Sequence, residues 1–212
     1  MYRLYYSPGA ASLAVHWMLI ELGVPFEAIL TDIDKQAHKR PEYLKLNPGG
    51  VIPTLIVDGA PQAEAAALLM LLAERHPKAR LAPEPGSPAR ADYIQWMFYL
   101  ANTLQPSYRL WFYPDEGAGP QNAEATKAEA RKRIEAAWTR IDERFAAGRR
   151  YFVDDALTAV DFMATMLARW SRNMPKPAQH WPHVGAYIAR MKEMASLKEV
   201  HAREGLTDWI GQ

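Results

Sequence analysis

The sequence predicts an α+β amino-terminal domain with the element order β-α-β-α-β-β-α, followed by an all-α helical domain. Strand and helix patterns alternate over residues 1–80, and strand patterns almost vanish over residues 89–212. Between them, residues 81–88 (LAPEPGSP) hold three prolines and a glycine, a composition that resists both helix and sheet. We therefore expect a first domain over 1–80, a linker over 81–88 and a second domain over 89–212.

The first domain opens with a strand, a helix and a second strand. Residues at even positions of Tyr2–Tyr6 share one face, which is the period of a strand, and Ser7-Pro8-Gly9 breaks the pattern. Gly23 and the proline after it are typical of a helix end. Phe26–Leu30 then reads as a strand that returns beside the first. The helix between the strands has apolar residues at helical spacing: Leu13, Trp17 and Ile20.

A hairpin and a helix complete the first domain. The turn sequence Asn47-Pro48-Gly49-Gly50 precedes an apolar strand over Thr54–Val57. Asp58-Gly59 follows, and this dipeptide favours a tight hairpin turn. A short returning strand ends before Glu64, where a run of helix formers begins, and Pro77 closes that helix.

The second half shows helical periodicity. Residues 123–137 are rich in Ala, Glu, Lys and Arg, which is typical of a solvated helix face. Elsewhere apolar residues recur at helical spacing and predict a bundle. They are Ile94, Met97, Phe98 and Ala101; Ile134, Trp138, Ile141 and Phe145; and Phe162, Met163, Met166, Leu167 and Trp170.

Composition limits the chemistry. The 25 Lys and Arg residues against 24 Asp and Glu give a net charge of +1, so no nucleic acid or membrane partner is expected. The chain has no cysteine, so any thiol chemistry must use a substrate's thiol. The start MYRLYYSPGA lacks a signal-peptide core, and we expect a cytoplasmic location. The histidines are scattered, and only His180 and His183 approach a ligand spacing, so no metal is expected.

Three hydroxyls at the end of the first strand are candidates for catalysis: Ser12, Ser7 and Tyr6. Ser12 either caps the helix or donates to a substrate thiolate, which the helix start also favours. A thiol with a pKa of about 8.5 needs a drop of about two units, or roughly 2.7 kcal/mol, to be mostly ionised at neutral pH. Tyr6 is in phase with the buried strand face, and we rank it below the two serines.

Two further positions are candidates for binding. Position alone favours a trans Ile52-Pro53 bond, because only about 5% of X-Pro bonds are cis. A cis bond would turn the N–H and C=O of Ile52 outward, where an extended peptide could pair with them. Glu64 opens a helix whose first N–H groups favour a carboxylate, while Glu64 would face an ammonium group. Alternatively, Glu64 only complements the helix dipole, which is worth about 0.3 to 1 kcal/mol.

Together these motifs resemble the glutathione transferases, and the match extends along the whole chain. YYSPGAASLAVHWMLIELGVPFE resembles the opening of the bacterial beta-class enzymes, and NPGGVIPTL and Gln62-Ala63-Glu64-Ala65 resemble two of their glutathione-binding segments. The resemblance implies a thioredoxin-like domain within the GST fold, a cis Ile52-Pro53 bond and a homodimer. It implies that glutathione is bound at Val51, Ile52, Pro53, Glu64 and Ala65.

The chain also departs from the beta-class pattern. Ala11 stands where these enzymes typically carry a cysteine, so a serine must supply any thiol activation. Ala65 replaces a frequent serine, and Phe98 and Gln105 stand where an asparagine and a histidine are expected. Thr158-Ala159-Val160-Asp161 resembles the family's capping box, which we assign to folding.

The resemblance implies a detoxifying transferase in which the glutathione thiolate attacks an apolar electrophile. Two alternatives use the same scaffold: a non-catalytic protein that binds glutathione or apolar ligands, and a glutathione-dependent isomerase or ether-cleaving enzyme. We expect the co-substrate pocket among the aromatic residues that follow the first helix of the second domain. Its candidate residues are Tyr99, Gln105, Tyr108, Trp111 and Phe112, with Tyr113 and Trp170 nearby.

Overall fold

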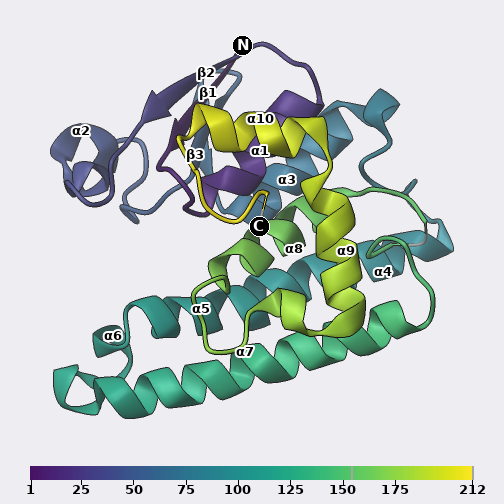
Figure 1. Ribbon diagram of the computed structural model, residues 1–212. Coiled ribbons are helices and arrows are strands. Elements are labelled where there is room, and N and C mark those ends of the chain that lie inside the picture. The colour runs from purple at the N-terminus through teal and green to yellow at the C-terminus, as the bar shows by residue number, and fades with distance from the viewer. Residues whose placement is uncertain (154, 212) are drawn as a thin grey trace. The chain divides into compact units, whose positions relative to one another are not determined.

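The computed structural model describes residues 1–153 and 155–211, which divide into two compact units (Figure 1). The first contains Met1–Ala82 together with Met191–Gln212, and the second contains Pro83–Arg190. This division follows contacts within the chain, whereas the domain limits expected from the sequence, 1–80 and 89–212, stay a prediction.

The first unit is built on a four-stranded mixed sheet with the strand order β2-β1-β3-β4. β1 (Tyr2–Tyr6) pairs in parallel with β2 (Phe26–Leu30) and antiparallel with β3 (Thr54–Val57), which pairs antiparallel with β4 (Ala60–Ala63). All four residues of β3 are buried, which agrees with its uninterrupted apolar sequence. The helices of this unit are α1 (Ser12–Glu21), α2 (Pro41–Leu44), α3 (Ala65–Arg75) and α10 (Ala195–Arg203). The expected order β-α-β-α-β-β-α is therefore confirmed for residues 2–75.

Helix α1 is the core helix of this unit. It is apolar on nearly every face and packs against both α3 and α10, as expected for a helix surrounded by other elements. Figure 1 shows α10, near the carboxyl end of the chain, lying beside α1 near its amino end. The carboxyl-terminal segment is thus part of the same core as the first turn of the protein.

Two turns of the sheet have the backbone that the sequence suggested or the resemblance implied. Asp58 and Gly59 both have positive φ values, 52° and 84°, so the expected tight hairpin turn forms between β3 and β4. The Ile52-Pro53 bond is cis. The expectation from the resemblance is confirmed, and the trans bond favoured by position alone is wrong.

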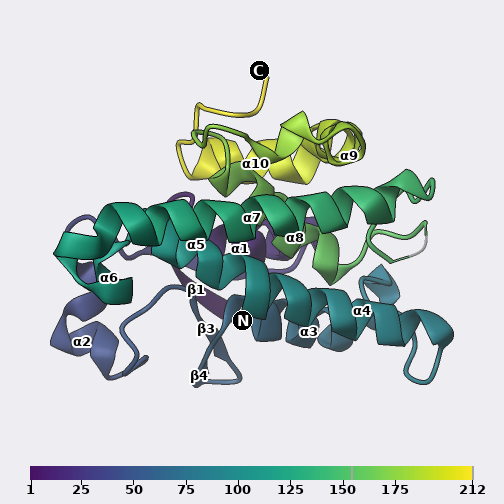
Figure 2. The ribbon, with the colours of Figure 1, turned by 90° about the horizontal axis from the view of Figure 1, so that it is seen from below.

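The second unit is helical, which confirms the expected all-α half. A π-helical turn over Leu100–Leu104 joins α4 to α5, and Pro106, which has no N–H to continue the regular ladder, is the second residue of α5. Figure 2 shows α5 running beside the long helix α7. The helices are α4 (Pro88–Tyr99), α5 (Gln105–Phe112), α6 (Asp115–Ala118), α7 (Ala123–Ala146), α8 (Ala159–Trp170) and α9 (Pro182–Lys192), of which the last two residues belong to the first unit.

Helix α8 forms the centre of the second unit, because all its residues from Ala159 to Arg169 are buried. Its first turn is fixed by the expected capping box, in which Thr158 and Asp161 bond reciprocally with each other's backbone. Short 3-10 turns elsewhere in the chain cover Ala37–Lys39, Pro77–Ala79, Pro120–Asn122 and Ala178–His180.

Candidate functional site

Three strand ends meet at one end of the sheet. The register pairs Tyr5 of β1 with Thr54 of β3, and Thr54 in turn with Ala63 of β4. The residues one step beyond these pairs are Tyr6, Pro53 and Glu64. The three predicted parts of the site, which we call the three stations, therefore lie at the ends of neighbouring strands. The structure therefore brings the candidate hydroxyls, the X-Pro turn and the start of α3 to the same end of the sheet.

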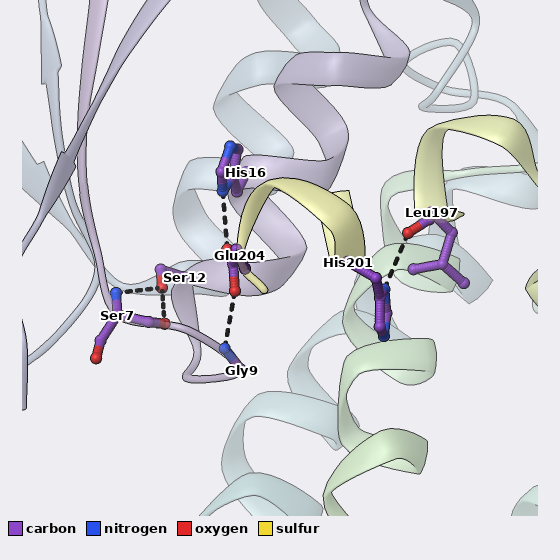
Figure 3. A network of polar contacts seen from close by, with 7 residues as sticks. All are labelled: Ser7, Gly9, Ser12, His16, Leu197, His201 and Glu204. Atoms are coloured by element: carbon purple, nitrogen blue, oxygen red, sulfur yellow. Dashed lines mark hydrogen bonds and ion pairs between the residues drawn. The ribbon is translucent and has the colours of Figure 1, made fainter. Parts of the chain in front are cut away.

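The turn between β1 and α1 is closed by a pair of hydrogen bonds between its two serines (Figure 3). The backbone N–H of Ser7 donates to the Ser12 hydroxyl oxygen at 3.1 Å, and that hydroxyl donates back to the Ser7 carbonyl oxygen at 3.1 Å. Ser12 is fully buried. Its hydroxyl proton is thus already used within the turn.

The Ser7 hydroxyl is in a different situation. Its oxygen accepts one hydrogen bond, from the backbone N–H of Ile33 at 3.3 Å. Figure 3 shows the side chain pointing away from Ser12 and from Glu204. Within residues 1–153 and 155–211, the hydroxyl proton of Ser7 has no acceptor. Ser7 is buried, with 3% of its surface exposed. Its hydroxyl can therefore still donate one hydrogen bond.

Tyr6 is half-buried, and its ring lies 5.1 Å from the ring of His16. Burial raises the pKa of the Tyr6 phenol, and the nearby negative charge of Glu204 raises it further. At neutral pH this phenol therefore stays protonated.

The turn is also held by Glu204, which sequence reasoning missed. One carboxylate oxygen accepts from the Gly9 N–H at 2.8 Å, and the other lies 2.8 Å from Nδ1 of His16 (Figure 3). Because a carboxylate only accepts, the proton of this contact belongs to His16 Nδ1. Both side chains are almost completely buried. His16, a polar residue inside the apolar run of α1, was the one signal that could have pointed to such a partner.

The segment before β3 is held in place from one side. The Val51 carbonyl oxygen accepts from the Tyr43 hydroxyl at 2.6 Å and from the Asn47 side-chain amide at 2.9 Å. By contrast, neither the N–H nor the C=O of Ile52 has a hydrogen-bond partner among the residues described. The structure fixes this segment and leaves one residue's backbone groups free to pair.

The start of α3 carries the Glu64 carboxylate and unpaired backbone N–H groups. Glu64 precedes the helix with a φ of 68° and an exposed side chain that does not cap it. The N–H groups of Ala65 and Ala66 have no hydrogen-bond partner in the described chain. Two unpaired N–H groups at a helix start favour a negatively charged group.

The expected pocket residues of the second unit separate into three groups. Tyr108 is fully buried, its hydroxyl accepts from the Trp138 indole N–H at 2.9 Å, and burial raises the pKa of its phenol. Phe112 is 47% exposed and contacts both Tyr108 and Trp170 through its ring. Trp111 instead faces α7, where the Lys127 ammonium lies 4.7 Å from its ring.

Tyr99 and Gln105 lie on either side of the π-helical turn, and both are half-buried. The Arg140 guanidinium stacks over the Tyr99 ring at 4.5 Å. Burial raises the pKa of Tyr99, and the positive charge of Arg140 partly offsets this. The structure thus joins Tyr108 with Phe112, while Trp111 and Tyr99 each contact a different cation.

Residues 1–153 and 155–211 contain no group of three or more His, Asp or Glu side chains placed to hold a metal ion. No helix in this part of the chain combines the length and the apolar character that a membrane span requires.

The comparisons with known proteins agree with this geometry. Residues 10–75 match the description "Glutathione S-transferase, N-terminal domain", and residues 93–194 match "Glutathione S-transferase, C-terminal domain". Glutathione S-transferase GST-4.5 of Xanthomonas campestris pv. campestris is 30% identical over 208 residues, which cover 96% of this chain and 99% of that protein.

Solved structures share the fold along the whole chain. A bacterial beta-class glutathione S-transferase from Sphingomonas chungbukensis has a TM-score of 0.84 and 25% identity, with 97% of this chain and 100% of that one covered. A sphingomonad glutathione S-transferase complexed with glutathione has a TM-score of 0.84 and 28% identity, at the same coverage. With both halves matched, the chain belongs to the glutathione S-transferase family, and it resembles the beta class without carrying its cysteine.

Proposed function

We propose that this protein is a glutathione transferase that ionises the thiol of bound glutathione and directs it at apolar electrophiles. The observation that carries the proposal is the row of unused polar groups along one end of the sheet. These are the Ser7 hydroxyl proton, the backbone groups of Ile52 and the first N–H groups of α3. Such groups are normally paired when they lie near the protein interior, so a polar ligand is the natural partner for them.

The backbone of glutathione fits the two outer stations. Its peptide would pair with the N–H and C=O of Ile52 in the manner of an added strand, flanked by Val51 and Pro53. The carboxylate of its γ-glutamyl end would accept from the N–H groups of Ala65 and Ala66, and the ammonium of the same group would face the Glu64 carboxylate. In this arrangement one helix start recognises both charges of an amino-acid group.

We assign the thiol to the turn after β1, with Ser7 as the hydroxyl that donates to the thiolate. No residue in the described part of the chain accepts the Ser7 proton, whereas the Ser12 proton is donated to the Ser7 carbonyl oxygen. Ser12 then acts by fixing the Ser7 backbone, and Tyr6 remains the third candidate. The N–H groups of Ala11 and Ser12 at the start of α1 also lack partners among the described residues, and they favour the negative charge further.

The reaction forms a bond between the glutathione sulfur and an electrophilic carbon. The bond to the leaving group breaks, the leaving group departs with the electron pair, and the thiol proton goes to solvent. We place the apolar electrophile at the helical unit, against the exposed ring of Phe112, which stacks on the buried ring of Tyr108. Further candidates for this pocket are Tyr99, Gln105 and Trp111. An exposed aromatic ring on a buried one offers a flat apolar surface.

We also propose that the protein is a cytoplasmic homodimer with a role in detoxification, as its resemblance to the beta class implies. Light scattering after gel filtration tests the assembly, and a particle of twice the 24.0 kDa chain mass is expected. A particle of one chain mass would contradict it.

A second function is favoured by one observation, the presence of Ala11 where a cysteine is typical. A protein with this change could bind glutathione or apolar ligands without activating the thiol. Turnover with an aryl chloride distinguishes the two: a transferase consumes one glutathione per chloride ion released, and a binding protein releases none. An isomerase or ether-cleaving enzyme on the same scaffold would form no glutathione conjugate from an aryl chloride. It would convert only a substrate of its own reaction.

A further inference from the structure

Three buried side chains form a closed ring of hydrogen bonds around the carbonyl oxygen of Val51. The Tyr43 hydroxyl donates to that oxygen at 2.6 Å, and the Asn47 side-chain amide donates to it at 2.9 Å. Thr54, the first residue of β3, closes the ring, because its Oγ1 lies 2.7 Å from the Tyr43 hydroxyl oxygen and 3.1 Å from Asn47 Nδ2. We call Tyr43, Asn47 and Thr54 the Val51 clamp; all three are buried.

The protons of the Val51 clamp can be assigned, because a carbonyl oxygen only accepts. The single Tyr43 hydroxyl proton goes to the Val51 oxygen, so the Thr54 hydroxyl donates to the Tyr43 oxygen. Burial raises the pKa of the Tyr43 phenol, which therefore keeps this proton at neutral pH. The Asn47 amide oxygen accepts from the Gly49 N–H at 3.1 Å, which leaves its two N–H groups for the Val51 oxygen and Thr54 Oγ1. Every side-chain donor of the clamp is thus used to hold one carbonyl group.

The Val51 carbonyl and the Ile52 N–H belong to the same planar peptide unit. The cis bond of the described chain is the next one, Ile52-Pro53, so the Val51-Ile52 bond is trans. In a trans unit the C=O and the N–H point in opposite directions. Fixing the Val51 oxygen on the side of the clamp therefore turns the Ile52 N–H to the other side, where it has no partner among the described residues. A carbonyl group that accepts two hydrogen bonds also polarises its peptide unit, which makes this N–H a stronger donor.

We propose that Tyr43 is a positioning residue for glutathione, because its hydroxyl aims the Ile52 N–H at the bound peptide. This role rests on the proposed function, in which the peptide of glutathione pairs with Ile52. Thr54 acts one step further away, by holding the Tyr43 hydroxyl in the direction of the Val51 oxygen. The thiol is assigned to the turn after β1, so Tyr43 should govern the binding of glutathione and leave the ionisation of its thiol unchanged.

The test measures the affinity for S-methylglutathione by calorimetry, because this probe keeps the peptide of glutathione and has no thiol to ionise. Tyr43→Phe removes the hydroxyl and keeps the ring, which packs against the Tyr5 ring at 5.8 Å. We expect the affinity to fall about five- to tenfold, which is the range of one net hydrogen bond. The matched control is Tyr2→Phe, at the other end of β1, where the hydroxyl lies 2.9 Å from His76 Nε2. It should bind within about twofold of the wild type, because distant sites act independently.

The two ways in which this test can fail are distinguishable. If the wild type binds S-methylglutathione and Tyr43→Phe binds it equally well, the role of Tyr43 is refuted and the glutathione site stands. If the wild type itself does not bind the probe, the proposed function and the role of Tyr43 are both overturned.

A conservative pair of variants and the steady-state kinetics separate positioning from a merely structural role. Thr54→Ser keeps the hydroxyl of the clamp and should bind the probe like the wild type, whereas Thr54→Val removes the hydroxyl and should weaken binding as Tyr43→Phe does. In Tyr43→Phe the KM for glutathione should rise, while kcat at saturating glutathione stays within about twofold of the wild type. Equal affinities of the two Thr54 variants, or a lower kcat at an unchanged KM, would overturn the proposal.

Discussion

The starts of helices α8 and α1 both carry buried polar networks, but the two networks differ in what they leave unused. At α8, the Asp161 carboxylate accepts from the backbone N–H groups of Thr158 and Phe152, at 2.8 Å and 3.1 Å. It also accepts from the hydroxyls of Thr158 and Tyr187, at 3.1 Å and 3.2 Å. Every strong acceptor position of this carboxylate has a donor within the protein.

At α1 the network leaves several hydrogen-bond donors without acceptors. Glu204 and Ser12 hold the turn from inside, yet the Ser7 hydroxyl proton and the first N–H groups of the helix lack partners among the described residues. The comparison teaches that a buried polar network alone does not identify a ligand site. The distinguishing feature is donor capacity that the protein itself leaves unused, and the following experiments test that distinction.

The largest expected effect is the loss of stability when the Asp161 network at the start of α8 is removed. Asp161→Ala orphans two buried backbone donors, each at a cost of about 1 to 3 kcal/mol, so the free energy of unfolding should fall by about 3 kcal/mol or more. Urea unfolding measures this, with Thr158→Ser as the control that keeps the cap. A loss below about 1 kcal/mol would mean that Asp161 does not hold the start of α8.

The charge of Asp161 adds a pH dependence to the same site. Burial raises the pKa of Asp161 from 3.8 to about 6 despite its hydrogen bonds. The folded state therefore holds this proton more tightly than the unfolded state, so Asp161 costs stability above pH 6, and the cost is relieved as the pH falls from about 6 toward 4. The stability of the wild type relative to Asp161→Asn should rise over that window, by at most about 3 kcal/mol. A constant difference from pH 7 to pH 4 would contradict this.

The turn at α1 should be less critical for folding and more critical for function. Glu204→Gln keeps the size of the side chain but removes the charge from its bonds to Gly9 and His16. We expect about 1 to 2 kcal/mol of lost stability and a lower kcat/KM for glutathione conjugation, because the turn that presents Ser7 is less firmly held. The matched control is Glu199→Gln on α10, the helix that Glu204 follows. Glu199 is an exposed partner of Arg203, and its substitution should change stability by less than about 0.5 kcal/mol. Equal effects of the two variants would refute the role of Glu204.

The smallest expected change in stability separates the two serines. Ser7→Ala removes one accepted hydrogen bond, from Ile33, while Ser12→Ala removes a donated and an accepted bond inside the turn. Ser12→Ala should therefore cost about 1 to 2 kcal/mol, and Ser7→Ala about 1 kcal/mol or less. Thermal unfolding of both variants measures the difference, and a larger cost for Ser7→Ala would show that Ser7 is the structural serine.

Local patterns predicted the parts of the molecule that local bonds determine. The Thr158–Asp161 capping box and the Asp58-Gly59 hairpin each depend on neighbours within a few positions. The three stations were predictable because strand order and register place the strand ends side by side. The cis bond before β3 required the resemblance, since its position alone favours trans.

Other features could not be read locally. Glu204 contacts residues 188 and 195 positions earlier in the chain, and no nearby pattern encodes that contact. The π-helical turn over Leu100–Leu104 inserts an extra residue and rotates α5 by about 100° relative to a regular helix. The aromatic residues of α5, treated as one cluster in the sequence, face two different neighbours. Tyr108 and Phe112 lie one turn apart on one face and contact Trp170, whereas Trp111 lies about 100° round the helix and contacts Lys127.

The central claim is that a hydrogen bond from the Ser7 hydroxyl stabilises the thiolate of bound glutathione and so lowers the pKa of the thiol. Ultraviolet difference spectra of bound glutathione across pH test it. In the wild type, we expect the thiol pKa to fall about two units below its free value of about 8.5. Ser7→Ala should return it most of the way, since a hydrogen bond to a charged group is worth about 1.5 to 3 kcal/mol, and Ser12→Ala should return it less. A bound thiol that titrates as it does in water would contradict the transferase mechanism and leave a glutathione-binding protein.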